Sequence, residues 1–379
     1  MKRTTVHSLA AITLLVLLQG CATRSTSWNS LPVPQRSPVG TDGVFQGIVE
    51  SEVESLMKAD KPKRVAVVAI DPRTGQILAE CSRRRGSDRE TDDAYTWAFL
   101  PASAYKPFIA AAALEDGYVS EQSLFDCGNG VAMFSGRPLK DYKPNGRRTV
   151  AEILQRSSNI GMARIGARMP SYALESYAFA FGFGKKTGIC RPAENSGVVW
   201  AAGADHDRGK VLHSIGRGVL VTPIQLAMAY AAIANGGLLL KPKDSWNENP
   251  VTVNRVISEK TSRTLRTMLA GVVSMKGTAP QAAVEGVTVG GKTGTSQVIL
   301  PGGHCSESQY VTLFAGFYPV EKPRVVCVVV VDRAQVPSEY NFGGLIAAPV
   351  FSRICAKALR DFNFFSYTWQ EKDLFQREK

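Results

Sequence analysis

Histidine is scarce in this chain, with four residues among 379. None of the seven cysteines stands at the spacing of a metal site, so the sequence predicts no bound metal. A glycine-rich phosphate loop and internal repeats are also missing, which argues against nucleotide-loop and repeat-array proteins. We therefore expect neither a metal nor a cofactor.

Acidic residues are outnumbered, since 33 Asp and Glu face 45 Lys and Arg, for a formal net charge of +12. A basic balance often accompanies nucleic-acid binding, but no nucleic-acid motif is present and the N-terminus indicates export. We expect no nucleic-acid partner, and attraction to anionic lipid or cell-wall polymer instead.

The N-terminus has the pattern of an export signal. Lys2 and Arg3 precede the apolar run 9–18, which is short for a membrane span and typical of a signal peptide. Gly20-Cys21 then completes a segment that resembles the bacterial lipobox. We expect a signal peptide at 1–20, a lipidated Cys21 and a polar tether within 21–62. The alternatives are cleavage elsewhere or retention as an anchor.

Six further cysteines remain, and an even number in an exported chain permits disulfides whose pairing the sequence does not define. Cys327 lies in an apolar run and is predicted to be a buried free thiol. The six are Cys81, Cys127, Cys190, Cys305, Cys327 and Cys355.

Ser103 and Lys106 form the first of three short motifs. The alanine-rich run after them predicts a helix that begins near Ser103, which would place the two side chains one turn apart. A serine hydroxyl needs a base, and Lys106 can serve if burial and a second cation, for which Lys292 is the candidate, lower its pKa. Taken alone, such a pair is more often a surface serine and lysine.

The second motif is Ser157-Ser158-Asn159. Thr149 and Glu152 match a capping box, and a second apolar periodicity follows Asn159, so the motif is predicted to join two short helices. There Ser157 can pass a proton to a leaving amine, and Asn159 can bind an amide with donor and acceptor. Simple helix capping is the alternative.

The third motif is Lys292-Thr293-Gly294-Thr295, in a stretch of β-branched residues and glycines that predicts a strand. Gly294 would let a peptide lie against this strand, and the hydroxyls beside Lys292 would bind a carboxylate. The N–H groups of Ser103 and Thr295 are candidates for an oxyanion hole. The alternative is an edge strand that ends in a glycine turn.

Together, the three motifs in this order resemble the signature of penicillin-binding proteins and class A β-lactamases. The chain from about 64 to about 359 resembles the transpeptidase domain of class B penicillin-binding proteins, the cell-division and elongation transpeptidases. Four further segments carry this resemblance: 65–79, 213–237, 314–319 and 343–351.

The resemblance implies a serine D,D-transpeptidase that cross-links peptidoglycan stem peptides and is acylated by β-lactams. Ser103 would be the nucleophile and Lys106 its base. Ser157 and Asn159 would serve proton transfer and substrate binding. The substrate carboxylate and oxyanion would be held by the third motif, Lys292, Thr293, Gly294 and Thr295.

Two other functions stay open at this point. A D,D-carboxypeptidase or β-lactamase would use water as acceptor, and a catalytically silent protein would only bind cell wall or sense β-lactams. The complete motif set argues against silence. No motif for a dedicated deacylating glutamate is found, which argues against a β-lactamase.

The chain departs from the family's pattern in three places. Ala102 stands where glycine is usual and Ala104 where threonine is common, and no loss of chemistry is expected because both are small. The segment 22–62 is too short for the usual N-terminal pedestal or a glycosyltransferase domain, so we expect a separate glycan polymerase.

The resemblance implies an α+β (mixed α/β) fold: a five-stranded antiparallel sheet with flanking helices and an all-helical lobe at about 114–235. The active site would lie between them. Periodicity places strands at 64–70, 76–81, 286–294, 311–318 and 324–332, and helices at 43–58 and 344–360. The catalytic domain would span 63–361, with a tail at 362–379. We expect a membrane-anchored lipoprotein of the cell envelope, facing the periplasm or the outside of the cytoplasmic membrane.

Overall fold

The computed structural model describes residues 43–361, apart from 88, 202–205, 301 and 303. The expected signal peptide, Cys21, the first part of the tether and the tail at 362–379 lie outside the described residues. Within the described ranges, no helix is both long enough and apolar enough to cross a membrane.

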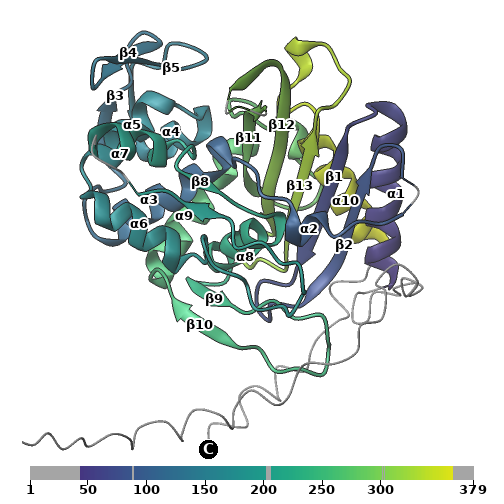
Figure 1. Ribbon diagram of the computed structural model, residues 1–379. Coiled ribbons are helices and arrows are strands. Elements are labelled where there is room, and N and C mark those ends of the chain that lie inside the picture. Colours follow the sequence, from purple (N-terminus) through teal and green to yellow (C-terminus); the bar gives the residue numbers. More distant parts are fainter. Residues whose placement is uncertain (1–42, 88, 202–205, 301, 303, 362–379) are drawn as a thin grey trace, which may run out of the picture. The chain divides into compact units, whose positions relative to one another are not determined.

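A five-stranded antiparallel sheet, as expected, forms the centre of the fold (Figure 1). Its order is β11-β12-β13-β1-β2, so the strand that carries the third motif lies at one edge. The bounds are β1 (Arg64–Ile70), β2 (Ile77–Arg84), β11 (Gly290–Ile299), β12 (Cys305–Tyr318) and β13 (Val325–Asp332).

Helices cover both faces of this sheet, which explains its continuous apolar strands. Every residue of β13 is buried, so its sequence shows valines on both faces, interrupted only by Cys327 before the final Asp332, instead of alternation. The helices α1 (Gly43–Ala59) and α10 (Ala347–Asp361) pack together over one face, and α8 (Pro223–Ala234) packs against β1, β12 and β13 from the other. All twelve residues of α8 are buried.

The predicted bounds of β1, β13 and α1 agree with the structure within one residue, but the third-motif strand was placed too early. Val284 and Val287 close a tight turn around Gly286, whose φ is +79°, so pairing with β12 begins only at Gly290. The strand then continues to Ile299, and β12 begins at Cys305, six residues before the prediction.

The expectation of an all-helical lobe is wrong in part. The lobe contains α3 (Lys106–Glu115), α4 (Val150–Arg156), α5 (Asn159–Ala167), α6 (Ser171–Ala180) and α7 (His206–Ser214), and α9 (Glu259–Val273) packs on α3 and α4. Short two-stranded sheets interrupt it: β3 (Leu124–Asp126) with β6 (Arg147–Thr149), β4 (Val131–Phe134) with β5 (Arg137–Lys140), and β7 (Val198–Val199) with β8 (Val219–Leu220). A fourth pairs β9 (Leu238–Leu240) with β10 (Thr252–Arg255).

The hairpin of β4 and β5 has a local cause in the sequence. Ser135 and Gly136 connect the strands, and both have positive φ, +46° and +72°. Two consecutive residues of this kind make the turn that matches strand twist, and glycine tolerates it best. A Ser-Gly pair between short polar–apolar segments was therefore a hairpin signal that our helical prediction overlooked.

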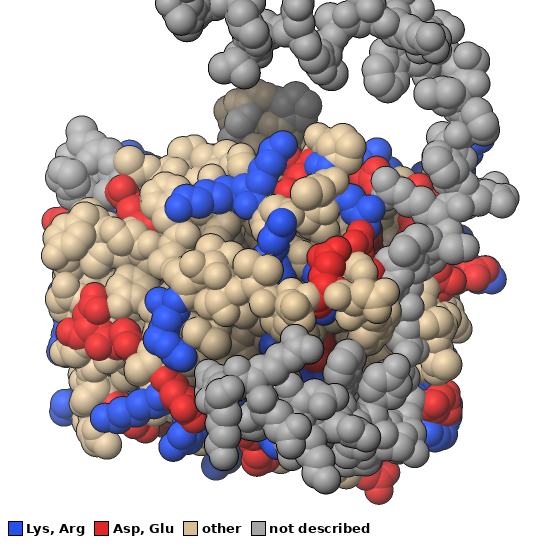
Figure 2. All heavy atoms as spheres, turned by 90° about the horizontal axis from the view of Figure 1, so that it is seen from below, with Lys and Arg blue, Asp and Glu red and all other residues tan. Residues whose placement is uncertain are grey.

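The six cysteines of the described chain are free thiols, and Cys327 is fully buried as predicted. Burial raises the pKa of Cys327 to about 12, which keeps this thiol protonated and unreactive. On the molecular face seen in Figure 2, basic and acidic side chains are interspersed over a largely uncharged surface, so the net charge forms no single large patch on that face.

Candidate active site

Ser103 lies in η1 (Ala102–Tyr105), a single 3-10 turn that leads directly into α3. The backbone N–H of Lys106 donates to the Ser103 carbonyl, so the two residues are one turn apart as predicted. Ala102 has a φ of +47°, a region that alanine rarely adopts. This conformation explains why glycine is usual at that position, and it makes Ala102 a strained residue beside the nucleophile candidate.

Contacts with two other elements fix the chain that enters this turn. Phe99 pairs with Val221, and Ser296 Oγ on β11 donates to the Leu100 carbonyl at 3.0 Å. A Cβ built on Gly294 would lie 2.5 Å from the Pro101 carbonyl oxygen. Gly294 is therefore required for close packing of η1 on β11, a reason that differs from the substrate contact we expected of it.

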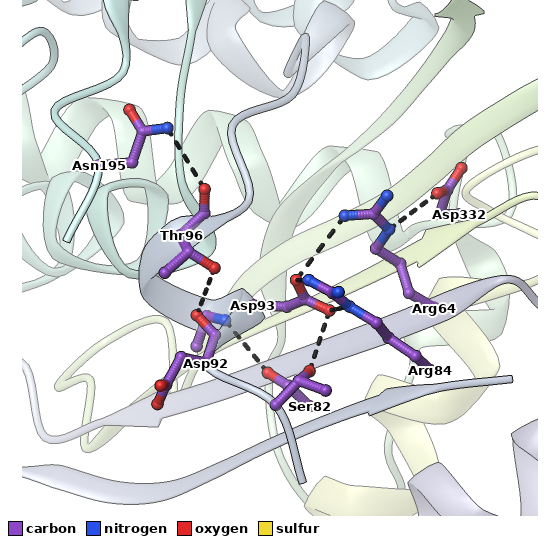
Figure 3. Close-up of polar contacts among 10 residues, drawn as sticks. Arg64, Ser82, Arg84, Asp92, Asp93, Thr96, Asn195 and Asp332 are labelled. Atoms are coloured by element: carbon purple, nitrogen blue, oxygen red, sulfur yellow. Dashed lines mark hydrogen bonds and ion pairs between the residues drawn. The ribbon is translucent and has the colours of Figure 1, made fainter. Parts of the chain in front are cut away.

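Further back, a polar network ties α2 (Asp93–Thr96) to the sheet (Figure 3). The buried Asp93 carboxylate accepts from Arg84 Nε at 2.7 Å and lies 3.7 Å from Arg64, which is itself paired with Asp332. Burial raises the pKa of Asp93, but the bonds from Arg84 and Thr91 outweigh it and the pKa is lowered. These ion pairs of Asp93 fix α2, where the segment that leads to Ser103 begins.

The second motif lies between two helices, as predicted, and the capping box of Thr149 and Glu152 is present. Ser157 ends α4 in the left-handed conformation, with φ +58°, and Ser158 caps α5 by accepting from the Gly161 N–H at 2.9 Å. The capping role therefore belongs to Ser158, which leaves the side chains of Ser157 and Asn159 for other contacts.

Both predicted lysines reach Ser157. Lys106 Nζ donates to the Ser157 carbonyl at 2.7 Å and lies 3.4 Å from Ser157 Oγ, while Lys292 Nζ lies 2.9 Å from the same hydroxyl. Lys106 Nζ also donates to Asn159 Oδ1 at 2.8 Å. The structure thus brings one residue of the first motif, two of the second and one of the third into a single hydrogen-bonded cluster.

In the described part of the chain, Ser103 Oγ and Lys106 Nζ do not form a hydrogen bond with each other. Lys106 is instead held by the oxygen acceptors of Ser157 and Asn159. Catalytic hydrogen bonds are often loose in free enzymes and tighten when substrate binds, so this geometry leaves the assignment of Lys106 intact.

The threonines of the third motif have partners outside the cluster. Thr293 Oγ1 lies 3.0 Å from Thr278 Oγ1, and Thr295 Oγ1 accepts from the Gly343 N–H at 3.1 Å. Among the described strands, β11 pairs only with β12 and lies at the edge of the sheet. This free edge can pair with an extended peptide, which is how strand addition recognises a chain.

Burial governs the electrostatics of the two lysines. Both side chains are fully buried. Desolvation lowers the pKa of Lys106 to about 7, and Asp141 partly opposes that shift. The pKa of Lys292 is lowered well below its usual value, first by burial and second by the charge of Lys106. The sequence predicts that burial and the charge of Lys292 together lower the pKa of Lys106. Burial is confirmed as the main cause, but Lys292 is not among the causes of this shift.

The sequence analysis did not identify Asp141, an acidic residue that contacts the second motif directly. Asp141 Oδ1 accepts from the Asn159 N–H at 2.5 Å, and Asp141 Oδ2 accepts from Ser158 Oγ at 2.6 Å. No local pattern marks such a residue, because it precedes Ser158 by seventeen positions and contacts it only through the fold. A lone aspartate after a hairpin was the only available signal.

Within residues 43–361, excluding the few positions left undescribed, no group of three or more His, Cys, Asp or Glu could hold a metal ion. The expectation that the protein needs no metal stays a prediction.

Comparison with known proteins agrees with this geometry. Residues 65–356 match the family model of the penicillin-binding protein transpeptidase domain. Stage V sporulation protein D of Bacillus subtilis is 33% identical, over 84% of this chain and 52% of that protein. Peptidoglycan D,D-transpeptidase FtsI of Escherichia coli is 31% identical, over 85% and 55%. The chain therefore spans about half the length of these curated relatives.

A solved structure gives the same result for the fold. The transpeptidase domain of penicillin-binding protein 3 from Burkholderia pseudomallei is similar with a TM-score of 0.79 and 32% identity, covering 86% of this chain and 97% of that one.

Proposed function

The chain belongs to the penicillin-binding protein transpeptidase family, and on this premise we propose that it is a serine D,D-transpeptidase that cross-links peptidoglycan stem peptides. The observation that carries the proposal is that the side chains of Lys106 and Lys292 both reach Ser157 Oγ, while Lys106 lies one turn from Ser103. The cluster supplies a buried amine able to lose its proton near neutral pH and a hydroxyl between two amines, and Ser103 supplies the nucleophile.

The reaction we infer has two halves. Ser103 Oγ attacks the carbonyl of the terminal D-alanyl peptide bond and gives its proton to the neutral amine of Lys106. Ser157 Oγ, bonded to both lysines, passes a proton to the leaving D-alanine nitrogen as the C–N bond breaks. An amine from a second stem peptide then attacks the Ser103 ester, and the proton it loses returns to Ser103 along the same route.

Substrate binding is assigned to the remaining motif residues. Asn159 Nδ2 has two hydrogens, and one is used by the Lys140 carbonyl at 2.8 Å, so the other is free for a substrate amide. We propose that Lys292, Thr293 and Thr295 bind the terminal carboxylate. The N–H groups of Ser103 and Thr295 would stabilise the oxyanion.

The acyl-enzyme formed with a β-lactam is expected to persist. Its hydrolysis needs a general base beside the ester. Among the described residues, Asp141 is the carboxylate bonded at the second motif, and its oxygens accept from Ser158, Asn159, Ile160 and Asn145. A carboxylate with all four acceptor positions used is poorly placed to activate water.

The experiment that tests the proposed function is intact mass measurement of the purified protein after incubation with penicillin, followed over time. We expect one adduct per protein that lasts for many minutes. Turnover of many penicillin molecules per second would contradict the transpeptidase proposal and favour a β-lactamase. Incubation with a D-alanyl peptide and an acceptor amine separates the remaining alternative, because a carboxypeptidase yields only the hydrolysed peptide.

We further propose that Cys21 carries a lipid anchor that holds the enzyme in the cell envelope, facing the periplasm or the outside of the cytoplasmic membrane. The support is the lipobox-like sequence at the end of the apolar run. The catalytic unit would span 63–361, and a separate enzyme would polymerise the glycan strands.

Replacement of Cys21 by serine should release the protein from the membrane fraction, because a serine hydroxyl does not form the thioether of a lipidated cysteine. Western blotting of fractionated cells measures the distribution. Cys190→Ser is the matched control, since Cys190 is an exposed cysteine of the described chain, and this variant should stay with the membrane. A mature wild-type protein without acyl mass at its N-terminus would contradict the anchor.

A further inference from the structure

Asp141 lies in the loop that follows β5, and its carboxylate holds the start of α5. Oδ1 accepts from the backbone N–H groups of Asn159 and Ile160 at 2.5 and 3.1 Å, while Oδ2 accepts from Ser158 Oγ at 2.6 Å. These contacts satisfy N–H groups that a helix start leaves without partners, and they place a negative charge at the positive end of α5.

The loop itself holds Asp141 in place. Asn145 is buried and donates from Nδ2 to Asp141 Oδ2 at 2.8 Å and to the Lys143 carbonyl at 3.1 Å. The Asp141 N–H donates to the Gly130 carbonyl at 2.9 Å, and the Asn145 N–H reaches Gly128. The carboxylate is therefore fixed by the base of the β4–β5 hairpin and not by α5 alone.

A short chain of bonds runs from this hairpin to the catalytic lysine. Asn159 is held by its N–H on Asp141 and by Nδ2 on the Lys140 carbonyl, which turns Oδ1 toward Lys106 Nζ at 2.8 Å. Lys140 and Asp141 are adjacent in the chain, so one corner of the hairpin sets both the backbone and the amide of Asn159.

We propose that Asp141 is a positioning residue for acyl transfer, which orients Asn159 and Ser158 so that Lys106 is held beside Ser157 and Ser103. The inference extends the proposed function and rests on it. It assigns the β4–β5 hairpin a part in building the site, although no residue of the hairpin belongs to the three motifs.

The charge of Asp141 gives the proposal a readout that a purely structural role would not change. Two charged groups act on Lys106 or are acted on by it: Lys292 on β11 and Asp141 in the hairpin loop. Asp141 also acts on the thiol of Cys127, as does Arg164. Because Asp141 raises the pKa of Lys106 against the effect of burial, loss of this charge should lower that pKa.

Two substitutions separate orientation from charge. Asp141→Asn keeps an acceptor for the N–H groups of Asn159 and Ile160 but removes the charge, so the acid limb of the pH profile of penicillin acylation should move to lower pH by on the order of half a unit. Asp141→Ala removes both the acceptor and the charge, and the acylation rate constant of this variant should fall roughly 10- to 100-fold. Thermal unfolding is measured for each, to compare folded fractions.

Asp126→Asn is the matched control, because Asp126 is an exposed aspartate of the same lobe whose carboxylate accepts only from the nearby Gly128 N–H among the bonds described. It should leave both the rate and the pH profile unchanged. An unshifted acid limb in Asp141→Asn overturns the proposal, even if Asp141→Ala fails to fold. An acylation rate constant of folded Asp141→Ala within twofold of the wild-type value also overturns the proposal.

A second measurement is independent of activity. Protein labelled with ¹³C at the lysine ε-carbons is titrated by NMR, and the Lys106 resonance is identified by its loss in Lys106→Arg. Lys106 should titrate at lower pH in Asp141→Asn than in wild type, and identical titrations would overturn the inference. The Lys106 titrations of wild type and Asp141→Asn can differ as expected while penicillin fails to acylate wild type. In that case the proposed function fails, but the effect of Asp141 on Lys106 stands.

Discussion

Replacing Ser103 by alanine should abolish covalent labelling by a fluorescent penicillin. The ester can form only on the hydroxyl that lies at η1, one turn from Lys106. No other described serine combines a position at the start of the buried helix α3 with a lysine one turn away. Labelling is measured by gel fluorescence, and intact mass should show the adduct on wild type alone.

The matched control for this change is Ser55→Ala, since Ser55 is exposed on α1, on the sheet side of the fold. That variant should label like wild type. Ser103→Ala should unfold at a similar temperature to wild type, because only one partly exposed oxygen is removed. Undiminished labelling of a folded Ser103→Ala would refute the assignment of the nucleophile.

Lys106→Arg should lower the acylation rate constant by several orders of magnitude, because a guanidinium keeps its proton at every accessible pH and does not act as a base. The base we propose for wild type is the neutral amine of Lys106, whose pKa burial lowers to about 7. Acylation should therefore rise as pH increases through about 7 and level off above it. Stopped-flow measurement of acylation from pH 5 to 9 tests both the loss of rate in Lys106→Arg and the rise of the wild-type rate with pH.

Lys292→Arg is the informative comparison, since Lys292 is also buried and also bonded to Ser157 Oγ. If Lys292 supplies charge and hydrogen bonds, this variant should lose much less activity than Lys106→Arg and should keep a rising limb. The roles would have to be exchanged if Lys292→Arg were the more damaged variant. Equal rates for Lys106→Arg and wild type would refute Lys106 as the base.

The central sheet could be predicted because its pattern is local. Strands β1 and β13 are unbroken apolar runs flanked by turn residues, and both were placed within one residue. The start of β11 was misplaced because Val287 continues the β-branched pattern into a turn closed by Val284. Only the pairing with β12, a contact distant in sequence, distinguishes the turn from the strand.

The candidate site could be predicted only where its residues stand in a local sequence pattern. Ser103, Ser157 and Lys292 were found from short motifs, but the motifs do not show which atoms meet. Asp141 was not predicted, because its hydrogen bonds connect a hairpin to the start of a helix. Likewise, Gly294 belongs to the third motif, yet the Pro101 carbonyl that requires a glycine there lies on another element.

The two buried lysines also link folding to proton release. In the unfolded chain each amine would bind a proton up to about pH 10.4, whereas the folded protein lowers the pKa of both. The unfolded state therefore holds more protons at neutral pH, and the free energy of unfolding should increase as pH rises from about 7 toward 10. Below the folded pKa values the penalty is complete, and for Lys106 alone it is on the order of a few kcal/mol. The catalytic centre is thus a local cost to stability, which the buried sheet and helices around it offset.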